Sequence, residues 1–293
     1  MCLQKIVSGI VIVLLGHVFT EVWGSRRHYE QQRALMKEVK GLQESQELLQ
    51  GEVISLRDTV NTLITFLKDT LPEDCSAART RGTWTSVVQV RPPGLPPRTV
   101  RCDQWTEGGG WTVILARRPT HSEDLPRLDF NRTWVDYKYG FGHINGEFWI
   151  GNEVLHALTR EAPHQLLVNL IDWNGRKAFA SWDSFRVESE TRLYRLNVHG
   201  YNHESTAGDS LRHHNHHPFS TFDHENDNDT LDHCAQKHGG GWWYFTCYVS
   251  HLTGTALGPS EPGEEGIIWR TWSKTLSLRE VSMMIRPPPS VSP

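Results

Sequence analysis

The chain has 293 residues, with 30 Lys and Arg against 34 Asp and Glu, a formal net charge of -4 and a pI ≈ 6.5. This small negative charge, without any long Lys/Arg run, argues against nucleic acid or an anionic membrane surface as the main partner. The 12 Trp and 24 Gly indicate a compact, loop-rich fold rather than a helical bundle. The length accommodates one large domain or two small ones.

Residues 1–24 are predicted to be a cleaved secretory signal peptide. Lys5 precedes the apolar run IVSGIVIVLLGHVF, which is short for a membrane span, and Gly24 offers the small residue that signal peptidase needs. We therefore expect a secreted, extracellular protein that begins near Ser25 and is not inserted in a membrane after cleavage. A retained signal anchor is the alternative.

Residues 25–72 show the apolar spacing of a coiled coil. The steps alternate between four and three residues, which keeps one stripe facing a partner helix and predicts a homo-oligomeric stalk. Valine at a with leucine at d favours a parallel two-stranded coil, and Gln46 at an a position is expected to set the register. The alternative is an amphipathic helix that lies on the head; Pro72 ends the helix. One row is Leu35, Leu42, Leu49, Leu56 and Leu63, and the other is Val39, Gln46, Val53, Val60 and Leu67.

The sequence changes character after Pro72. Short β-rich runs such as TWTSVVQV and GWTVILARR alternate with the turn segments RPPGLPP, EGGG and DWNGR. Residues 73–289 are therefore predicted to form one α+β domain with an antiparallel sheet. A helix is expected at Asn152 to Arg160, with Asn152 as its N-cap. The proline-rich tail, residues 290–293, is predicted to be disordered.

The cysteines indicate disulfides, because secretion places them in an oxidising compartment. Cys2 leaves with the signal peptide, and the four that remain allow three pairings. We favour the two local ones, Cys75–Cys102 and Cys234–Cys247, since each closes a short loop and would contribute about 3 kcal/mol in chain-entropy terms. Zinc ligation by cysteine is not favoured without CxxC spacing.

Six motifs in a fixed order closely resemble the fibrinogen C-terminal domain family. They are CDQWTEGGGWTVILARR, LDFNRTWVDYKYGFGHINGEFWIGN, LYRLNVHGYNHESTAGDSL, FSTFDHENDND, HCAQKHGGGWWYFTC and SLREVSMMIRP. The resemblance implies a mixed α+β head with two local disulfides, a structural calcium loop, an adjacent ligand pocket and no catalytic activity. A signal, a coiled coil and then this head look most like the angiopoietin-like branch, whereas ficolins carry a collagen stalk, of which no Gly-X-Y repeat is present.

The stretch HENDNDTLDHC places acidic residues at alternate positions, which is the crowding of hard oxygen ligands that calcium needs. A solvated acidic loop is the alternative. Counting forward from Ser220, the calcium pattern of the family falls on Glu225 and Asp227, with Asp229 as a substitute and Asp223 ahead of them.

The backward count gives a different result. From Cys234 the same pattern falls on Asn226 and Asn228, because this loop is one residue longer than the family pattern. We favour the forward count, which keeps charged oxygens on the metal. An EF-hand is excluded, since its glycine would fall on Asn228 and its bidentate glutamate on Cys234.

The ligand pocket implied by the resemblance departs from the acetyl-binding and fibrin-type versions. Tyr248 follows the last cysteine where acetyl binders have His, and Ala256 stands where Tyr is usual. His238 fills a slot that acetyl binders give to Tyr and the fibrinogen knob-binding hole gives to Asp. The resemblance also implies a cis bond between His233 and Cys234. The candidate pocket residues are His233, Cys234, His238, Trp243, Tyr244, Tyr248 and His251.

Two further motifs are candidates for modification or metal binding. The sequons NRT at Asn131 and NDT at Asn228 predict N-glycosylation sites, the second inside the calcium loop. The run LRHHNHHPF contains four histidines that could hold zinc, although a solvated His-rich loop is favoured. These are His213, His214, His216 and His217.

The patterns indicate a binding protein rather than an enzyme, because the nucleophile elbow, HExxH, P-loop and GxGxxG patterns are absent. We expect a secreted, calcium-stabilised, oligomeric ligand of angiopoietin-like type that binds an extracellular or cell-surface receptor protein, with the stalk supplying avidity. One alternative is a pattern-recognition lectin of innate immunity that binds glycans or acetylated groups. A further alternative is regulation of a lipase through the coiled coil.

Overall fold

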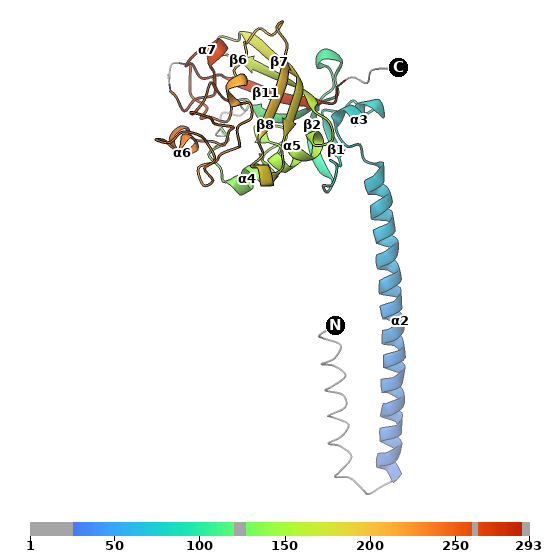
Figure 1. Ribbon diagram of the computed structural model, residues 1–293. Coiled ribbons are helices and arrows are strands. Elements are labelled where there is room, and N and C mark those ends of the chain that lie inside the picture. The colour runs from blue at the N-terminus through green and yellow to red at the C-terminus, as the bar shows by residue number, and fades with distance from the viewer. Residues whose placement is uncertain (1–25, 120–126, 260–262, 289–293) are drawn as a thin grey trace. The chain divides into compact units, whose positions relative to one another are not determined.

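The computed structural model describes residues 26–119, 127–259 and 263–288 (Figure 1). The chain divides into two compact units, Met1–Leu67 and Lys68–Pro293. The predicted signal peptide and the tail lie outside the described residues. Among the described helices, none has the length and apolar character that a membrane span requires.

The described residues of the first unit form a long helix, α2 (Arg26–Thr70), which continues three residues past the boundary at Leu67. It ends ahead of Pro72, since the residue before a proline is disfavoured in the α conformation. The predicted leucine row is open to solvent in the single chain, with exposed fractions between 55% and 70% for Leu35, Leu42, Leu49, Leu56 and Leu63. The helix itself is confirmed.

The second unit is built on an antiparallel sheet, as predicted, with the strand order β1-β2-β3-β11-β6-β7-β8. The last strand of the chain, β11, lies between β3 and β6 and pairs with both, so the centre of the sheet is complete only when this last strand is in place. The strands are β1 (Val87–Val90), β2 (Arg98–Asp103), β3 (Trp111–Arg117), β6 (His164–Ile171), β7 (Lys177–Val187), β8 (Leu196–Tyr201) and β11 (Glu280–Arg286).

Short elements complete the unit. The pair β4 (Phe141–Gly142) and β5 (Phe148–Trp149) joins the sheet at β3, and β9 (Ser250–His251) pairs with β10 (Ile268–Trp269) in a separate two-stranded sheet. Figure 1 shows α6 and α7 on one side of the sheet and α3 beside β1 and β2 on the other. The helices are α3 (Cys75–Thr80), α4 (Trp134–Tyr139), α5 (Asn152–Thr159), α6 (Cys234–His238) and α7 (Arg270–Ser273), with the 3-10 turns η1 (Thr106–Gly108), η2 (Glu190–Arg192) and η3 (Arg212–His214).

The predicted helix at residues 152–160 is present as α5, but the prediction of its N-cap is wrong. Gly151 is the cap residue, and its φ of 107° is one that residues with a side chain rarely adopt. Asn152 lies inside the first turn and is buried, and its Oδ1 accepts a hydrogen bond from Trp149 Nε1 at 3.2 Å.

Both favoured disulfides are confirmed. Cys75–Cys102 links α3 to β2, with a Cα–Cα distance of 5.6 Å, and Cys234–Cys247 links α6 to the following loop, with a distance of 5.1 Å. The second bridge lies in the long irregular region between β8 and β11. This region packs on the core through buried aromatic side chains, among them Phe219, Trp242, Trp243 and Trp269.

Candidate functional site

The acidic loop is held at both ends by the rest of the irregular region. Before the loop, Ser220 and Trp242 exchange backbone hydrogen bonds of 2.9 and 3.1 Å. After it, α6 begins at Cys234, which the disulfide attaches to Cys247. The loop is therefore a closed segment whose side chains are oriented by fixed neighbours.

Within this loop the structure brings Glu225, Asp227 and His233 together. Their ligand atoms lie within 4.8 Å of one another, and His233 Nε2 is 3.9 Å from Glu225 Oε2. Asp227 is the fixed member, because its Oδ1 accepts from the Asp229 N–H at 2.9 Å and its Oδ2 accepts from the Cys234 N–H at 3.0 Å. The group contains the two carboxylates that the forward count selected.

The environment of Asp227 disfavours its negative charge. Burial raises the pKa of Asp227 above its ordinary value, the neighbouring charge of Glu225 raises it further, and its two backbone hydrogen bonds and His233 only partly oppose this. The positive charge of a divalent cation would instead favour the charged form of Asp227. Each carboxylate retains free lone pairs with which to bind such an ion. Calcium takes about six to eight oxygen ligands, so backbone carbonyls and water would complete the set; His233 offers nitrogen, which calcium does not favour.

The other two predicted ligands hold the loop in place. Asp223 Oδ1 accepts from the Trp134 N–H at 2.9 Å and from Thr221 Oγ1 at 2.7 Å, so it attaches the loop to the start of α4. Asp229 Oδ1 accepts from the Leu231 N–H at 3.0 Å. Neither belongs to the group around Asp227.

The residues of the backward count and the sequons lie at the edges of this group. Asn226 Nδ2 donates to the carbonyl of Phe219 at 2.8 Å, which directs this side chain toward the domain. Asn228 and Asn131 are both exposed, so either sequon is accessible to modification. Glycosylation at these positions stays a prediction.

Four of the predicted pocket residues form one cluster: His238, Tyr244, Tyr248 and His251. The ring of His238 meets that of Tyr248 edge-on at 4.9 Å, and Tyr248 lies 5.3 Å from His251. Tyr244 Oη and His251 Nε2 are 2.8 Å apart. All four side chains are at most 6% exposed, so they fill the place of the predicted pocket with their own atoms.

This cluster is uncharged near neutral pH. Burial lowers the pKa of His238 and lowers that of His251 well below its ordinary value, and burial raises the pKa of Tyr244. The Tyr244 hydroxyl donates to the carbonyl of Gly240 at 3.0 Å, and its oxygen can then accept a hydrogen bond from the N–H of His251 Nε2. The charged groups nearest to this cluster therefore lie at its rim.

Two rim residues were not predicted from the sequence, Glu264 and Arg270. Both are exposed. The Tyr248 hydroxyl donates to the backbone carbonyl of Glu264, and the Arg270 guanidinium lies 5.0 Å from the centre of the Tyr248 ring. They come from a segment distant in sequence and carry no motif, so no local signal would have found them.

The remaining predicted pocket residues lie elsewhere. Trp243 is a core residue: its Nε1 donates to the Tyr194 carbonyl at 2.8 Å, and its ring packs against Phe219 at 5.3 Å. His233 belongs to the acidic group, and Cys234 is buried in its disulfide. The expected cis bond between them is wrong, since every described peptide bond is trans, and the trans form is favoured by about 3 kcal/mol for a residue other than proline.

The expectation of a solvated His-rich loop is also wrong for His214. His214 is buried, with Nδ1 2.8 Å from the Trp243 carbonyl and Nε2 accepting from the Ser250 N–H at 3.0 Å. Burial lowers the pKa of His214 to about 3. The ring of His217 stacks on Phe245 at 4.2 Å. The groups that could hold a metal ion in the described part of the chain include none of these histidines.

This head, with its closing strand, two local disulfides and acidic loop, defines a fibrinogen-type globular domain. Residues 71–288 match the family described as fibrinogen beta and gamma chains, C-terminal globular domain, and the chain belongs to this family. Two human proteins with which it shares 40% identity are angiopoietin-related protein 7, over 221 residues (73% of this chain, 61% of that protein), and angiopoietin-related protein 6, over 219 residues (73% and 45%). The chain thus spans less than two thirds of the length of these curated relatives.

Solved structures show the same similarity. The fibrinogen-like globe domain of human ANGPTL6 aligns with a TM-score of 0.68 and 40% identity, covering 74% of this chain and 95% of that one. A lamprey fibrin D-dimer complexed with the peptide Gly-His-Arg-Pro-amide aligns with a TM-score of 0.67 and 25% identity, covering 100% and 96%. The fold is therefore shared with a protein that binds a short peptide.

Proposed function

We propose that the chain is a secreted, non-catalytic, oligomeric recognition protein of angiopoietin-like type whose globe binds an extracellular or cell-surface protein. The observation that carries this proposal is the closed, uncharged cluster of His238, Tyr244, Tyr248 and His251 beneath the charged rim of Glu264 and Arg270. A filled cluster offers little room for a small acetyl group. A rim of opposite charges suits a protein surface, where charge complementarity directs the encounter.

The acidic group supports a structural role for calcium in this proposal. Glu225 and Asp227 would hold the ion through carboxylate oxygens, and the ion would compensate the negative charge of the half-buried Asp227. The neighbouring backbone hydrogen bond from Cys234 to Asp227 connects this loop to α6, which also carries His238 of the cluster. Calcium would thus stabilise the recognition face without taking part in any reaction.

The long helix supports oligomerisation. The open leucine row of α2 is apolar surface that water disfavours, and pairing with a second copy would bury it. Linking several heads can strengthen a weak contact by about 10²–10⁴ without new contacts at the head.

The test compares the binding of the full chain to a panel of cultured cells with its binding to a glycan array, each with and without calcium. We expect cell binding that is lost when the cells are treated with protease, and no calcium-dependent binding to the array. Arg270→Ala should weaken cell binding by about tenfold, as expected for a charged contact at an interface. Arg192→Ala, which changes an exposed arginine of η2, should leave it unchanged. Calcium-dependent binding to sugars on the array, with protease-resistant cell binding, would instead support the lectin.

A further inference from the structure

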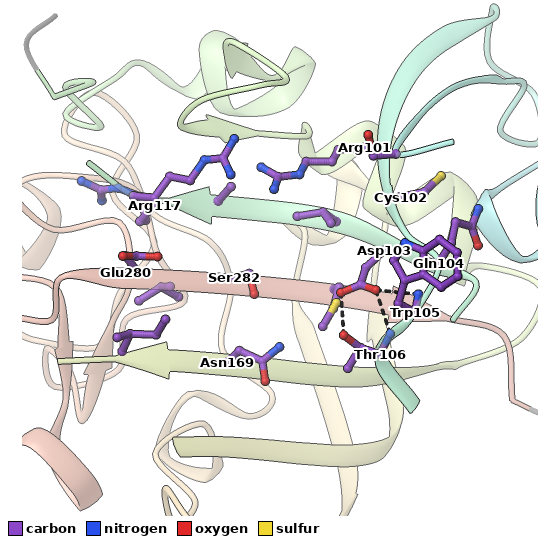
Figure 2. A pocket seen from close by; sticks show the side chains of 17 residues that line it. Arg101, Cys102, Asp103, Gln104, Trp105, Thr106, Arg117, Asn169, Glu280 and Ser282 are labelled. Atoms are coloured by element: carbon purple, nitrogen blue, oxygen red, sulfur yellow. Dashed lines mark hydrogen bonds between the residues drawn. The ribbon is translucent and has the colours of Figure 1, made fainter. Parts of the chain in front are cut away.

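An open pocket lies on the sheet and is formed by other residues than the cluster and the acidic group. Strands β2, β3, β11 and β6 line a pocket of about 400 Å³, shown in Figure 2. None of the cluster or acidic-group residues described above contributes to it. The volume lies within the range of about 300–1,000 Å³ that small-molecule sites occupy.

The floor of this pocket carries two polar side chains with free hydrogen-bonding capacity. Ser282 of β11 and Asn169 of β6 are partners in the strand register, and Figure 2 shows them on adjacent strands between Glu280 and Asp103. Both are partly exposed, and neither side chain forms a hydrogen bond with the described residues. A hydroxyl and an amide side by side can serve both donors and acceptors of a ligand.

Two arginines without a salt-bridge partner among the described residues line the pocket. They are Arg101 of β2 and Arg118, which follows β3. Burial is the main cause that lowers the pKa of Arg101, and the nearby positive charge of Arg118 lowers it further. Among the described residues, Arg101 has no carboxylate within salt-bridge distance, and the Arg118 guanidinium donates to the carbonyl of Asn145 and to no carboxylate. Two like charges facing one hollow would be stabilised by an anion between them.

The acidic residues of the pocket are already engaged. Asp103 accepts from the Trp105 and Thr106 N–H groups, both at 2.9 Å, and from Thr106 Oγ1 at 2.7 Å. Glu280 forms an ion pair with Arg279 at 2.7 Å. Arg117, which also lines the pocket, is paired with Glu147, so Arg101 and Arg118 share the single remaining carboxylate of Asp103, whose charge raises the pKa of Arg101. One positive charge therefore remains in excess.

An exposed aromatic ring stands beside the pocket. Trp105 is 75% exposed, which is unusual for a residue of this size, and Figure 2 shows it next to Asp103 at the end opposite Glu280. It is held in place by Trp84, whose ring lies at 5.8 Å and is covered in turn by the Arg79 guanidinium at 4.1 Å. A rigid, amphipathic ring next to hydrogen-bonding groups suits a ligand with one apolar face and a polar edge.

We propose that this pocket binds an acidic sugar, whose carboxylate is held between Arg101 and Arg118, whose hydroxyls bond to Asn169 and Ser282, and whose ring packs on Trp105. Arginine pairs with carboxylate in a planar, often bidentate geometry, which fits the first contact. A sugar fits better than an acidic peptide, because a pyranose offers several hydroxyls and an apolar ring face together. This site is independent of the protein-binding face proposed above, so either can fail without the other.

Matched monosaccharides test the chemistry. Glucuronic acid and glucose differ by a carboxylate in place of a hydroxymethyl group, and acetate supplies the carboxylate without the ring. We expect saturation-transfer NMR on the full chain to show that its affinity for glucuronic acid is about tenfold higher than its affinity for glucose. Its affinity for acetate should be no higher than that for glucose. Equal binding of glucuronic acid and glucose, or binding of acetate as tight as that of glucuronic acid, would overturn the proposal, as would no binding at all.

Variants then locate the site. Arg101→Gln should weaken glucuronic acid binding by about tenfold, and Trp105→Ala should weaken it by several-fold. Arg186→Gln is the control, since Arg186 is an exposed strand arginine of β7 outside this pocket. Thermal melts of each variant separate loss of binding from loss of folding, and Trp105 is exposed enough for its removal to leave the core intact. Undiminished binding in both test variants would place the sugar elsewhere and refute the assignment.

Discussion

Glu147 is a buried carboxylate that joins a loop to the central sheet. It is 4% exposed, and its Oε1 accepts from Arg117 Nε at 3.2 Å and from Arg127 Nη2 at 2.7 Å. Its Oε2 accepts from the Leu128 N–H at 2.8 Å. Arg117 depends on this partner, because it is itself 1% exposed and burial lowers its pKa to about 10.

Replacing Glu147 by glutamine should destabilise the head strongly, by about 3–5 kcal/mol, because it leaves the Arg117 charge buried without compensation. Urea denaturation at neutral pH measures the free energy of unfolding. Glu204→Gln, at an exposed site, is the control and should change it by less than about 0.5 kcal/mol. Equal stability of the two variants would contradict this role of Glu147.

The same residue predicts a pH dependence. Burial alone would raise the pKa of Glu147, but the hydrogen bond from Arg127 and the charges of Arg117 and Arg127 lower it below its ordinary value of 4.5. Since the pKa is lower in the folded state, this stabilisation is complete above pH 4.5 and is lost as the pH falls through the folded value. The wild type should therefore lose stability in this acid window more steeply than Glu147→Gln does.

At the scale of elements, the acidic loop shows how a local pattern can select a region without selecting its ligands. The alternation of acidic residues marked residues 223–229, and two register counts gave different ligand sets. The folded loop brings Glu225, Asp227 and His233 together and uses Asp223 and Asp229 for backbone hydrogen bonds. Counting positions could not decide this, because the path of the loop depends on its hydrogen bonds to the first residues of α4 and α6.

Calcium should stabilise the head through this loop. At a free concentration 100 times Kd, a bound ion contributes about 2.7 kcal/mol, so EDTA should lower the Tm and calcium should restore it. Asp227→Asn keeps the shape of the side chain but removes its charge, and it should abolish the calcium-dependent shift.

Asp232→Asn is the matched control for this experiment. It lies in the same loop, paired with Lys237 and outside the acidic group, and should retain the full shift. A wild type whose Tm does not respond to calcium, or an Asp227→Asn variant that responds as the wild type does, would rule out calcium at this loop.

At the scale of the whole molecule, the leucine row of α2 should determine the number of chains that associate. Leu49→Glu with Leu56→Glu places charge on the predicted seam and should give monomers in sedimentation equilibrium. Leu48→Glu with Ile54→Glu is the matched control, since these residues are similarly exposed but lie off the seam, and it should remain oligomeric. If both pairs of substitutions have the same effect, the heptad row is not the interface.

The sequence by itself determined the features that depend on near neighbours: the long helix, from its apolar period; the turns, from their glycines and prolines; and both disulfides, from the short loops they close. The family motifs also determined the fold of the head. Only the tertiary structure decided which side chains share a site. It showed Trp243 and His214 in the core, His233 with the acidic group, and Glu264 and Arg270 at the rim of the cluster. The physical reason is that burial and charge act between residues that are distant in sequence and meet only when the chain is folded.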